Sequence, residues 1–169
     1  FAHALYQNVL YGELLNKRRG LLHRQAGEQL AQHYAGDNAT KLYANSEAAE
    51  HYAHGLGLVE KLPIEEQGER LLTLYQKRGA ANFTLTRFPQ AVADFTRMLD
   101  QARALGKSVP EHAALNLLAN TLFFSQRVNE MTARTDEALR VAERAGSEAL
   151  RLETLVLITL KHECYGELA

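Results

Sequence analysis

Two stretches of the chain carry the same residue pattern, forty residues apart. Residues 79–106 read GAANFTLTRFPQAVADFTRMLDQARALG, and residues 119–146 read ANTLFFSQRVNEMTARTDEALRVAERAG. Small, aromatic and aliphatic residues recur at matching positions: Gly79 with Ala119, Phe83 with Phe123, Leu99 with Leu139, Ala102 with Ala142 and Gly106 with Gly146. A period near 40 residues is typical of a solenoid built from stacked helix pairs.

The apolar residues inside each unit follow helical spacing. One stripe contains Leu71, Leu74, Tyr75, Gly79 and Phe83, and its partner contains Ala91, Phe95, Met98, Leu99 and Ala102. Steps of three and four place such residues on one face of a helix. The short turn around residues 86–88 requires the two helices to be antiparallel neighbours. We therefore expect an all-α fold, a right-handed α-α superhelix of helix pairs.

A similar helix lies 43 residues upstream, and the whole chain divides into about eight helices. In that upstream helix Ala48, Tyr52, Leu56 and Val59 take the places of Ala91, Phe95, Leu99 and Ala102. The expected helices are Ala4–Asn16, Arg18–Tyr34, Asn45–Leu62, Ile64–Thr86, Pro89–Leu105, Pro110–Ser125, Val128–Ala145 and Ser147–Tyr165.

The helix ends carry recognisable stop and start residues. Gly106 and Gly146 follow helical stretches, and glycine adopts the left-handed conformation past a helix end at little cost. Pro63 cannot continue a helix. Ser108 and Ser147 are expected to cap the helices that follow them.

Composition indicates a protein without a strong charge preference. Of 169 residues, 46% are hydrophobic and 23% are charged, and the formal net charge is −1. No global field then draws the chain to nucleic acid or to a membrane surface. No segment approaches the roughly 20 apolar residues of a membrane span. The single cysteine, Cys164, has no partner for an internal disulfide, which suits the cytoplasm.

Residues that could carry chemistry lack the context that chemistry needs. Gly106-Lys107-Ser108 matches the end of a phosphate-binding loop, but Gln101 stands where the loop needs glycine. His51 and His54 share a helix face, but a zinc site requires three or four ligands. We therefore predict no catalytic residue, cofactor or metal, and hence no enzyme.

The alternation of small and aromatic residues resembles tetratricopeptide repeats. Gly79 and Ala119 match the small residue of the family's first helix, and Ala91 and Phe95 match the alanine and aromatic of its second. The chain departs from the pattern at Asn82, Met131 and Thr135. Its longer period resembles repeats of bacterial signalling ATPases.

The N-terminal run also resembles a known junction. FAHALY at 1–6, VLYGELL at 9–15 and the basic residues Arg18 and Arg19 are similar to a segment of large bacterial adenylate/guanylate-cyclase-like proteins and related ATPase-type transcriptional regulators. The resemblance implies a helical junction at residues 1–36 that follows an ATPase module, then tetratricopeptide-like repeats at 37–169, cut at the C-terminus. Such relatives have more residues between His23 and Asn45.

The basic cluster Lys17-Arg18-Arg19 belongs to this junction. Residues 1–36 hold four basic and two acidic residues, whereas residues 37–70 hold three basic and seven acidic ones. Packing against the ATPase module explains the cluster better than nucleic-acid binding, because no recognition helix or interleaved aromatic residue accompanies it.

Two functional hypotheses follow from the expected fold. The first is a scaffold for a protein or peptide partner, including other domains of the same chain. The second is a sensory domain that binds a small effector and controls a linked ATPase, cyclase or transcriptional-regulator module. A pocket closed by Phe83 and Phe123 would favour the small effector, and an open groove would favour a peptide.

The first helix of each pair lines the concave face in this fold class. The repeat register places five candidate binding residues there: Gln76, Phe83, Asn116, Asn120 and Phe123. Asparagine can bind a peptide backbone through its donor and its acceptor together. The two phenylalanines could equally belong to the core. The helix at 147–165 is apolar on more than one face, so we expect self-association through it.

Overall fold

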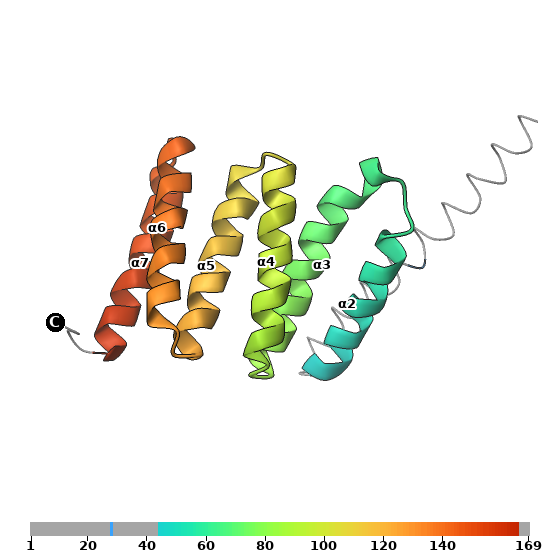
Figure 1. Cartoon of the computed structure of the whole chain (residues 1–169), viewed down its shortest axis with the longest axis horizontal. Coiled ribbons are helices and arrows are strands. Elements are labelled where there is room, and N and C mark those ends of the chain that lie inside the picture. The colour runs from blue at the N-terminus through green and yellow to red at the C-terminus, as the bar shows by residue number, and fades with distance from the viewer. Residues whose placement is uncertain (1–27, 29–43, 166–169) are drawn as a thin grey trace, which may run out of the picture.

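The protein is described by a computed structural model that covers residue 28 and residues 44–165. These residues form six α-helices and no strand (Figure 1), which confirms the all-α helix-pair fold. The helices are α2 (Asn45–Val59), α3 (Ile64–Thr84), α4 (Phe88–Ala104), α5 (Ser108–Phe124), α6 (Val128–Arg144) and α7 (Glu148–Tyr165).

Two of the expected helices, the basic cluster and the suspected gap after His23 lie outside the described residues. The proposed boundary at residues 36 and 37 lies there too, so the division into two domains stays a prediction. The remaining six helices begin and end within three residues of their expected bounds.

The four turns between α3 and α7 share one backbone design. Each contains a single residue with φ near +60°, at positions 86, 106, 126 and 146, which are 20 residues apart. The next residue donates its backbone N–H to the carbonyl five positions back, as Arg87 does to Asn82 at 2.9 Å. This is the Schellman ending of a helix. Gly106 and Gly146 adopt it as expected, whereas Thr86 and Gln126 adopt it despite their side chains.

The two expected serine caps have different outcomes. Ser147 accepts a hydrogen bond from the backbone N–H of Leu150 at 3.4 Å, which confirms it as a cap of α7. Ser108 was a wrong prediction, because it is the first residue of α5 and Lys107 holds the cap position without a side-chain bond. Helix α5 begins at Ser108 itself, one residue earlier than a cap at Ser108 requires, so the serine side chain does not stand at the capping position.

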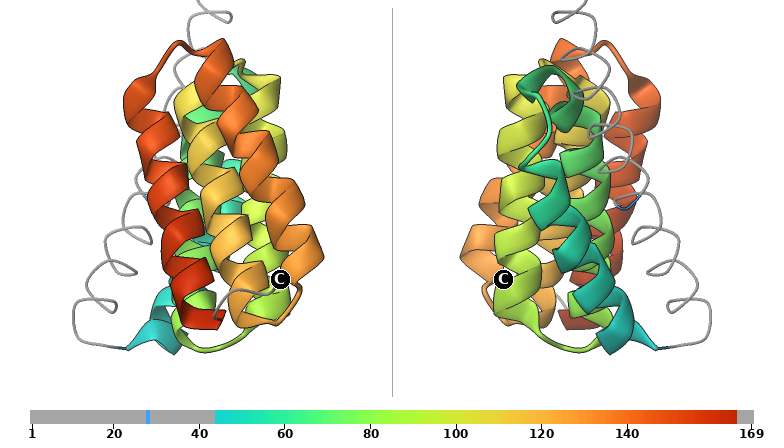
Figure 2. Two further views of the ribbon diagram at one scale, coloured as in Figure 1. Left: turned by 90° about the vertical axis from the view of Figure 1, so that its left-hand side faces the viewer. Right: turned by 90° about the vertical axis from the view of Figure 1, so that its right-hand side faces the viewer.

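The helices form two layers, α3–α5–α7 and α2–α4–α6 (Figures 1 and 2). Each helix packs against the next one along the chain, and α5 also contacts α3 and α7. The helices of the other layer make less contact with one another. The α3–α5–α7 layer is therefore the more tightly spaced, and an array of this kind curves toward that side.

Small residues allow the layers to approach closely. Ala91, Ala102, Ala114, Ala119 and Ala138 are fully buried, together with the large side chains of Phe95, Met98 and Leu115. One continuous core runs from Leu72 on α3 to Val141 on α6. The repeat register predicted from the sequence therefore places its small residues at the helix contacts.

Candidate functional site

The five residues predicted to bind a partner lie on α3 and α5, in the more tightly spaced layer. Gln76 is exposed and Phe83 is half-buried, both on one stripe of α3. Asn116 and Asn120 are half-buried on α5, and Phe123 is 7% exposed within a core cluster. None of these residues lines the cavity described below.

Phe83 and Phe123 belong to a row of four phenylalanine rings. The Phe83 ring lies 5.8 Å from Phe88 and 5.4 Å from Phe124, measured between ring centroids. Phe124 lies a further 5.4 Å from Phe123, edge to face. Phe83 and Phe123 therefore both contact Phe124, which is 52% exposed. Sequence reasoning missed Phe124, although it lies four and eight residues after Asn120 and Asn116 and so shares their helix face.

Lys161 of α7 joins this row to Asn120. Its Nζ lies 4.0 Å from the Phe123 ring centroid and 4.6 Å from that of Phe124. It also donates a hydrogen bond to Asn120 Oδ1 at 2.7 Å. A lysine over aromatic faces is stabilised by the ring quadrupoles. We call Phe83, Phe88, Phe123, Phe124, Asn120 and Lys161 the phenylalanine surface.

Asn116 takes part in a buried polar group between α5 and α7. Thr154 donates to Asn116 Oδ1 at 3.1 Å, and its hydroxyl lies 2.8 Å from His112 Nε2. His112 is fully buried, and its Nδ1 has no hydrogen-bond partner among the described residues. Burial lowers the pKa of His112, against the opposing effects of the Glu153 charge and the Leu150 backbone. Asn116 thus has an internal partner on the neighbouring pair.

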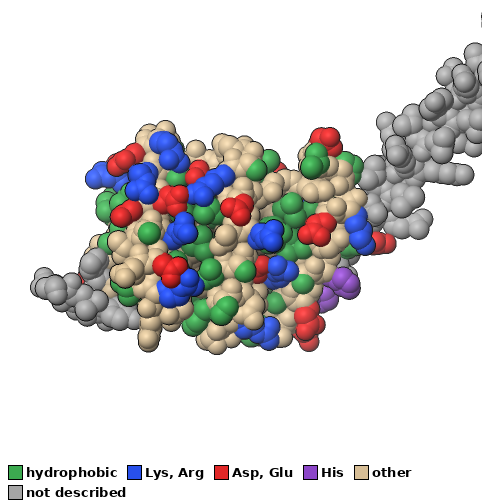
Figure 3. All heavy atoms as spheres, viewed as in Figure 1, with side chains coloured by type: hydrophobic (Ala, Val, Ile, Leu, Met, Phe, Trp, Pro, Cys, Tyr) green, Lys and Arg blue, Asp and Glu red, His purple; other side chains and the backbone are tan. Residues whose placement is uncertain are grey.

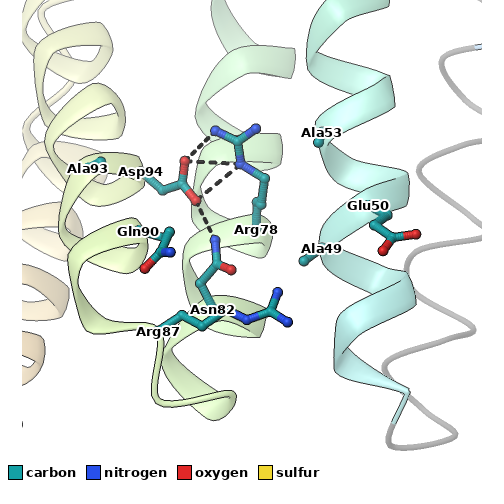
Figure 4. A pocket seen from close by; sticks show the side chains of 9 residues that line it. All are labelled: Ala49, Glu50, Ala53, Arg78, Asn82, Arg87, Gln90, Ala93 and Asp94. Atoms are coloured by element: carbon teal, nitrogen blue, oxygen red, sulfur yellow. Dashed lines mark hydrogen bonds and ion pairs between the residues drawn. The ribbon is translucent and has the colours of Figure 1, made fainter.

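An open surface pocket of about 340 Å³, called the cavity below, lies on the other side of the molecule, between α2 and α4 and above α3 (Figure 4). Its walls are small side chains, Ala49 and Ala53 of α2 and Ala93 of α4. Polar residues complete its lining: Arg78 and Asn82 of α3, Arg87 of the following turn, Gln90 and Asp94 of α4, and Glu50 of α2. In Figure 4 the Glu50 side chain points away from the others.

Asp94 organises the floor of this cavity. It is 3% exposed and accepts from Arg78 Nε at 3.0 and 3.1 Å, from Arg78 Nη2 at 2.5 Å and from Asn82 Nδ2 at 3.0 Å. The carboxylate is thereby fully paired. The sequence could have indicated this polar group, because in the forty-residue alignment Arg78 and Asn82 occupy positions that are Leu118 and Leu122 in the next repeat.

Charged side chains of both signs are interspersed over the α2–α4–α6 side (Figure 3). Arg103 of α4 pairs with Glu137 of α6 and, at 3.2 Å, with Glu111 of α5. Arg144 reaches the same Glu111 at 3.5 Å. These pairs cross-link three helices at the surface and leave no single-sign field over the described face.

The described residues contain no group of three or more histidine, cysteine, aspartate or glutamate side chains placed to hold a metal ion. His33 and the side chain of Cys164 lie outside this search. None of the helices described is long and apolar enough to cross a bilayer.

No protein-family model and no curated protein matches the sequence. Solved structures do match the fold. The Rap conjugation gene regulator of plasmid pLS20, in complex with the Phr* peptide, has a TM-score of 0.69 and 17% identity over 80% of this chain. The N-terminal domain of stress-induced protein-1 from C. elegans has a TM-score of 0.62 and 15% identity over 79%.

The match spans 37% of the Rap regulator and 96% of the C. elegans domain. At these identities the similarity establishes the fold, and the two structures are tetratricopeptide-like helical repeats. The chain therefore has a tetratricopeptide-like helical-repeat fold. The bacterial cyclase and ATPase context expected from its N-terminal run remains a prediction.

Proposed function

We propose that this chain is a non-catalytic repeat scaffold that binds a protein or peptide partner through the phenylalanine surface. The observation that carries the proposal is the exposure of Phe124, which is 52% accessible while the rings of Phe83 and Phe123 pack against it and Phe88 packs against Phe83. An aromatic ring held by neighbouring rings is rigid. Binding to it therefore costs little conformational entropy, and aromatic anchors dominate many protein interfaces.

Polar groups beside the rings supply direction to such an interface. Asn120 Oδ1 accepts a hydrogen bond from Lys161, and the amide N–H groups of Asn120 form no hydrogen bond with the described residues. Gln76 is exposed on α3, on the same layer. Side-chain amides carry both a donor and an acceptor, so they suit the alternating groups of an extended backbone. A peptide complex is known for the Rap regulator of similar fold, which supports a peptide as the class of partner.

The regulatory context is a further part of the proposal. The resemblance of the N-terminal run supports a place beside an ATPase, cyclase or transcriptional-regulator module of a bacterial signalling protein in the cytoplasm. The alternative, a small effector that controls that module, is favoured by the 340 Å³ cavity on the opposite side of the molecule. It is not favoured at Phe83 and Phe123, because Phe124 contacts both rings.

A selection from a random peptide library tests the scaffold proposal. Peptides enriched on the wild-type chain should lose most of their binding to Phe124→Ser and bind Ile64→Ser normally. Ile64 is the matched control, because it is an apolar residue with 80% exposure at the start of α3. Fluorescence anisotropy of the enriched peptides gives the affinities. An enriched set that binds Phe124→Ser as well as wild type would refute this surface.

A further inference from the structure

The cavity between α2 and α4 exists because the three-helix unit α2–α3–α4 differs in sequence from the next unit, α4–α5–α6, at several positions. In the forty-residue register, Arg78 and Asn82 stand where α5 has Leu118 and Leu122. On α2, the 43-residue offset places Ala49 and Ala53 where α4 has Val92 and Thr96. Val92 of α4 and Leu118 of α5 pack into one core cluster in the unit α4–α5–α6. In the unit α2–α3–α4, the smaller and more polar residues at these positions leave a space between the helices.

The polar group of Arg78, Asn82 and Asp94 is a poor way to stabilise the fold by itself. A buried ion pair must recover the desolvation of both charges, and well-packed apolar residues of similar volume often stabilise as much or more. The chain itself has apolar residues at the corresponding positions of α5, where Leu118 and Leu122 stand in place of Arg78 and Asn82. The geometry of Arg78, Asn82 and Asp94 therefore calls for another role.

These three residues leave specific hydrogen-bonding groups directed into the cavity. Asp94 occupies Nε and Nη2 of Arg78, whereas Nη1 forms no hydrogen bond with the described residues; the Arg78 Cζ atom also lies 5.9 Å from the Tyr75 ring centroid. Figure 4 shows that nitrogen turned toward α2 and the wall of Ala49 and Ala53. The amide of Asn82 donates to Asp94, and its carbonyl oxygen points away from that carboxylate (Figure 4). The cavity thus presents guanidinium donors with an acceptor nearby.

Arg87 adds a positive charge, and the corresponding arginine of the next repeat unit is neutralised by a glutamate. Its counterpart Arg127 forms a two-bond ion pair with Glu130, at 2.6 Å for each bond. The counterpart of Glu130 is Gln90, so Arg87 has no acidic partner among the described residues. Arg87 instead reaches Ser46 of α2 at 3.5 Å. It therefore lies at one end of the cavity, and no described residue neutralises its charge.

We propose that this cavity binds a carboxylate group, held by Arg78 and Arg87 and flanked by a hydrogen-bond donor that Asn82 Oδ1 accepts. Guanidinium groups match planar carboxylates through paired N–H bonds. Arg78 and Asp94 balance each other, and the Glu50 side chain points away from the other lining residues (Figure 4), so Arg87 supplies the remaining charge at the site. The cavity volume suits a small molecule or one acidic side chain. The cavity opens between α2 and α4, on the opposite side of the molecule from the phenylalanine surface, and the proposal is independent of that surface.

Titration monitored by amide chemical shifts tests the proposal and separates the two sources of the carboxylate. The free-molecule probes are succinate and its neutral isostere succinamide, in a buffer without carboxylates. The peptide probes are acetyl-Glu-Glu-Glu-amide and acetyl-Gln-Gln-Gln-amide. We expect saturable shifts around the cavity with succinate, or with the glutamate peptide if a protein side chain supplies the group, and none with the neutral probes.

Two variants remove the site and keep the ion pair of Asp94 with Arg78. Each introduces the residue found at the corresponding position of the unit α4–α5–α6. Gln90→Glu recreates the Arg127–Glu130 pair around Arg87, and Ala49→Val adds the side chain that Val92 has. Each should weaken carboxylate binding about tenfold or more, because one removes the free charge and the other the space. Phe124→Ser should bind as wild type does.

The outcomes are distinguishable. Binding by succinate alone identifies a small ligand, and binding by the glutamate peptide alone identifies an acidic segment; both support the carboxylate site. No saturable binding by either probe overturns the proposal. Equal binding of inorganic phosphate, equal binding of the neutral probes, or unchanged binding by both variants also overturns it.

Discussion

The ring of Phe95 on α4 lies directly against the backbone of Gly79 on α3. A Cβ atom added at residue 79 would lie 2.5 Å from the ring Cε1 and 2.8 Å from Cδ1. Both atoms belong to a rigid ring that is 1% exposed, so the ring cannot move aside freely. The next pair holds Ala119 and Thr135 at the corresponding positions. There a methyl group is present and the ring is absent.

Gly79→Ala should therefore destabilise the protein by about 1–3 kcal/mol, the usual effect of overpacking a core. Urea denaturation followed by circular dichroism measures the change. Gly57→Ala is the control: Gly57 is exposed in α2 with nothing within 4 Å of its added Cβ, so alanine there should stabilise by up to about 1 kcal/mol. Adding Phe95→Leu to Gly79→Ala should recover part of the loss.

Ala91→Arg should be more damaging. Ala91 is 0% exposed at the contact of α4 with its neighbours, and arginine there would be both too large and unpaired. A loss of roughly 3 kcal/mol or more is expected. Ala104→Arg makes the same change at an exposed position at the end of α4 and should be nearly neutral. Equal melting temperatures for the two variants would contradict the repeat register.

Arg78→Ala should cost about 3–5 kcal/mol, because it leaves the Asp94 carboxylate buried without its guanidinium partner. The combined variant Arg78→Leu, Asn82→Leu, Asp94→Ala removes both charges of the ion pair and introduces the leucines that α5 has at the corresponding positions. It should be considerably more stable than Arg78→Ala alone in the same denaturation assay. If the combined variant is the less stable one, the ion pair stabilises the fold more than we infer.

Acid should weaken the contact between α5 and α7 through His112. Burial lowers the pKa of His112 below its ordinary value of 6.5. Below pH 6.5 the unfolded chain therefore takes up a proton that the folded chain refuses, and the free energy of unfolding falls as pH falls toward the lowered pKa. Denaturation at pH 7.5 and pH 5.5 should show this loss in wild type, and a smaller difference between the two pH values in His112→Gln.

Self-association is expected through α7. Leu152 and Val156 are 52% and 57% exposed, one turn apart on the helix. Their counterparts in α5 are His112 and Asn116, which contact the following pair. Sedimentation at high concentration should show dimers or larger species that Leu152→Lys with Val156→Lys abolishes. Ile64→Lys should leave association unchanged. A wild-type monomer at every concentration would exclude this surface.

The amino-acid sequence was sufficient for the helix order, the helix bounds and the register of the small residues. These features depend on local chemistry that repeats every forty residues. Helical spacing sets which face is buried, and the position after each helix sets the turn. Ala91, Phe95 and Gly79 therefore occupy the contacts that their places in the pattern predict. Ser108 failed as a cap because α5 begins at Ser108 itself, and the repeat pattern does not define the start of a helix to a single residue.

The candidate sites depended on the tertiary structure. The phenylalanine surface needs Phe83, Phe124 and Lys161, which come from three helices and meet only when the pairs stack. The cavity depends on small side chains as much as on polar ones, because the methyl group of Ala49 leaves room above Arg78 that a larger side chain would fill. Periodicity identifies the positions that face inward. Only the packing of side chains from separate helices decides whether the space between them is filled or left as a site.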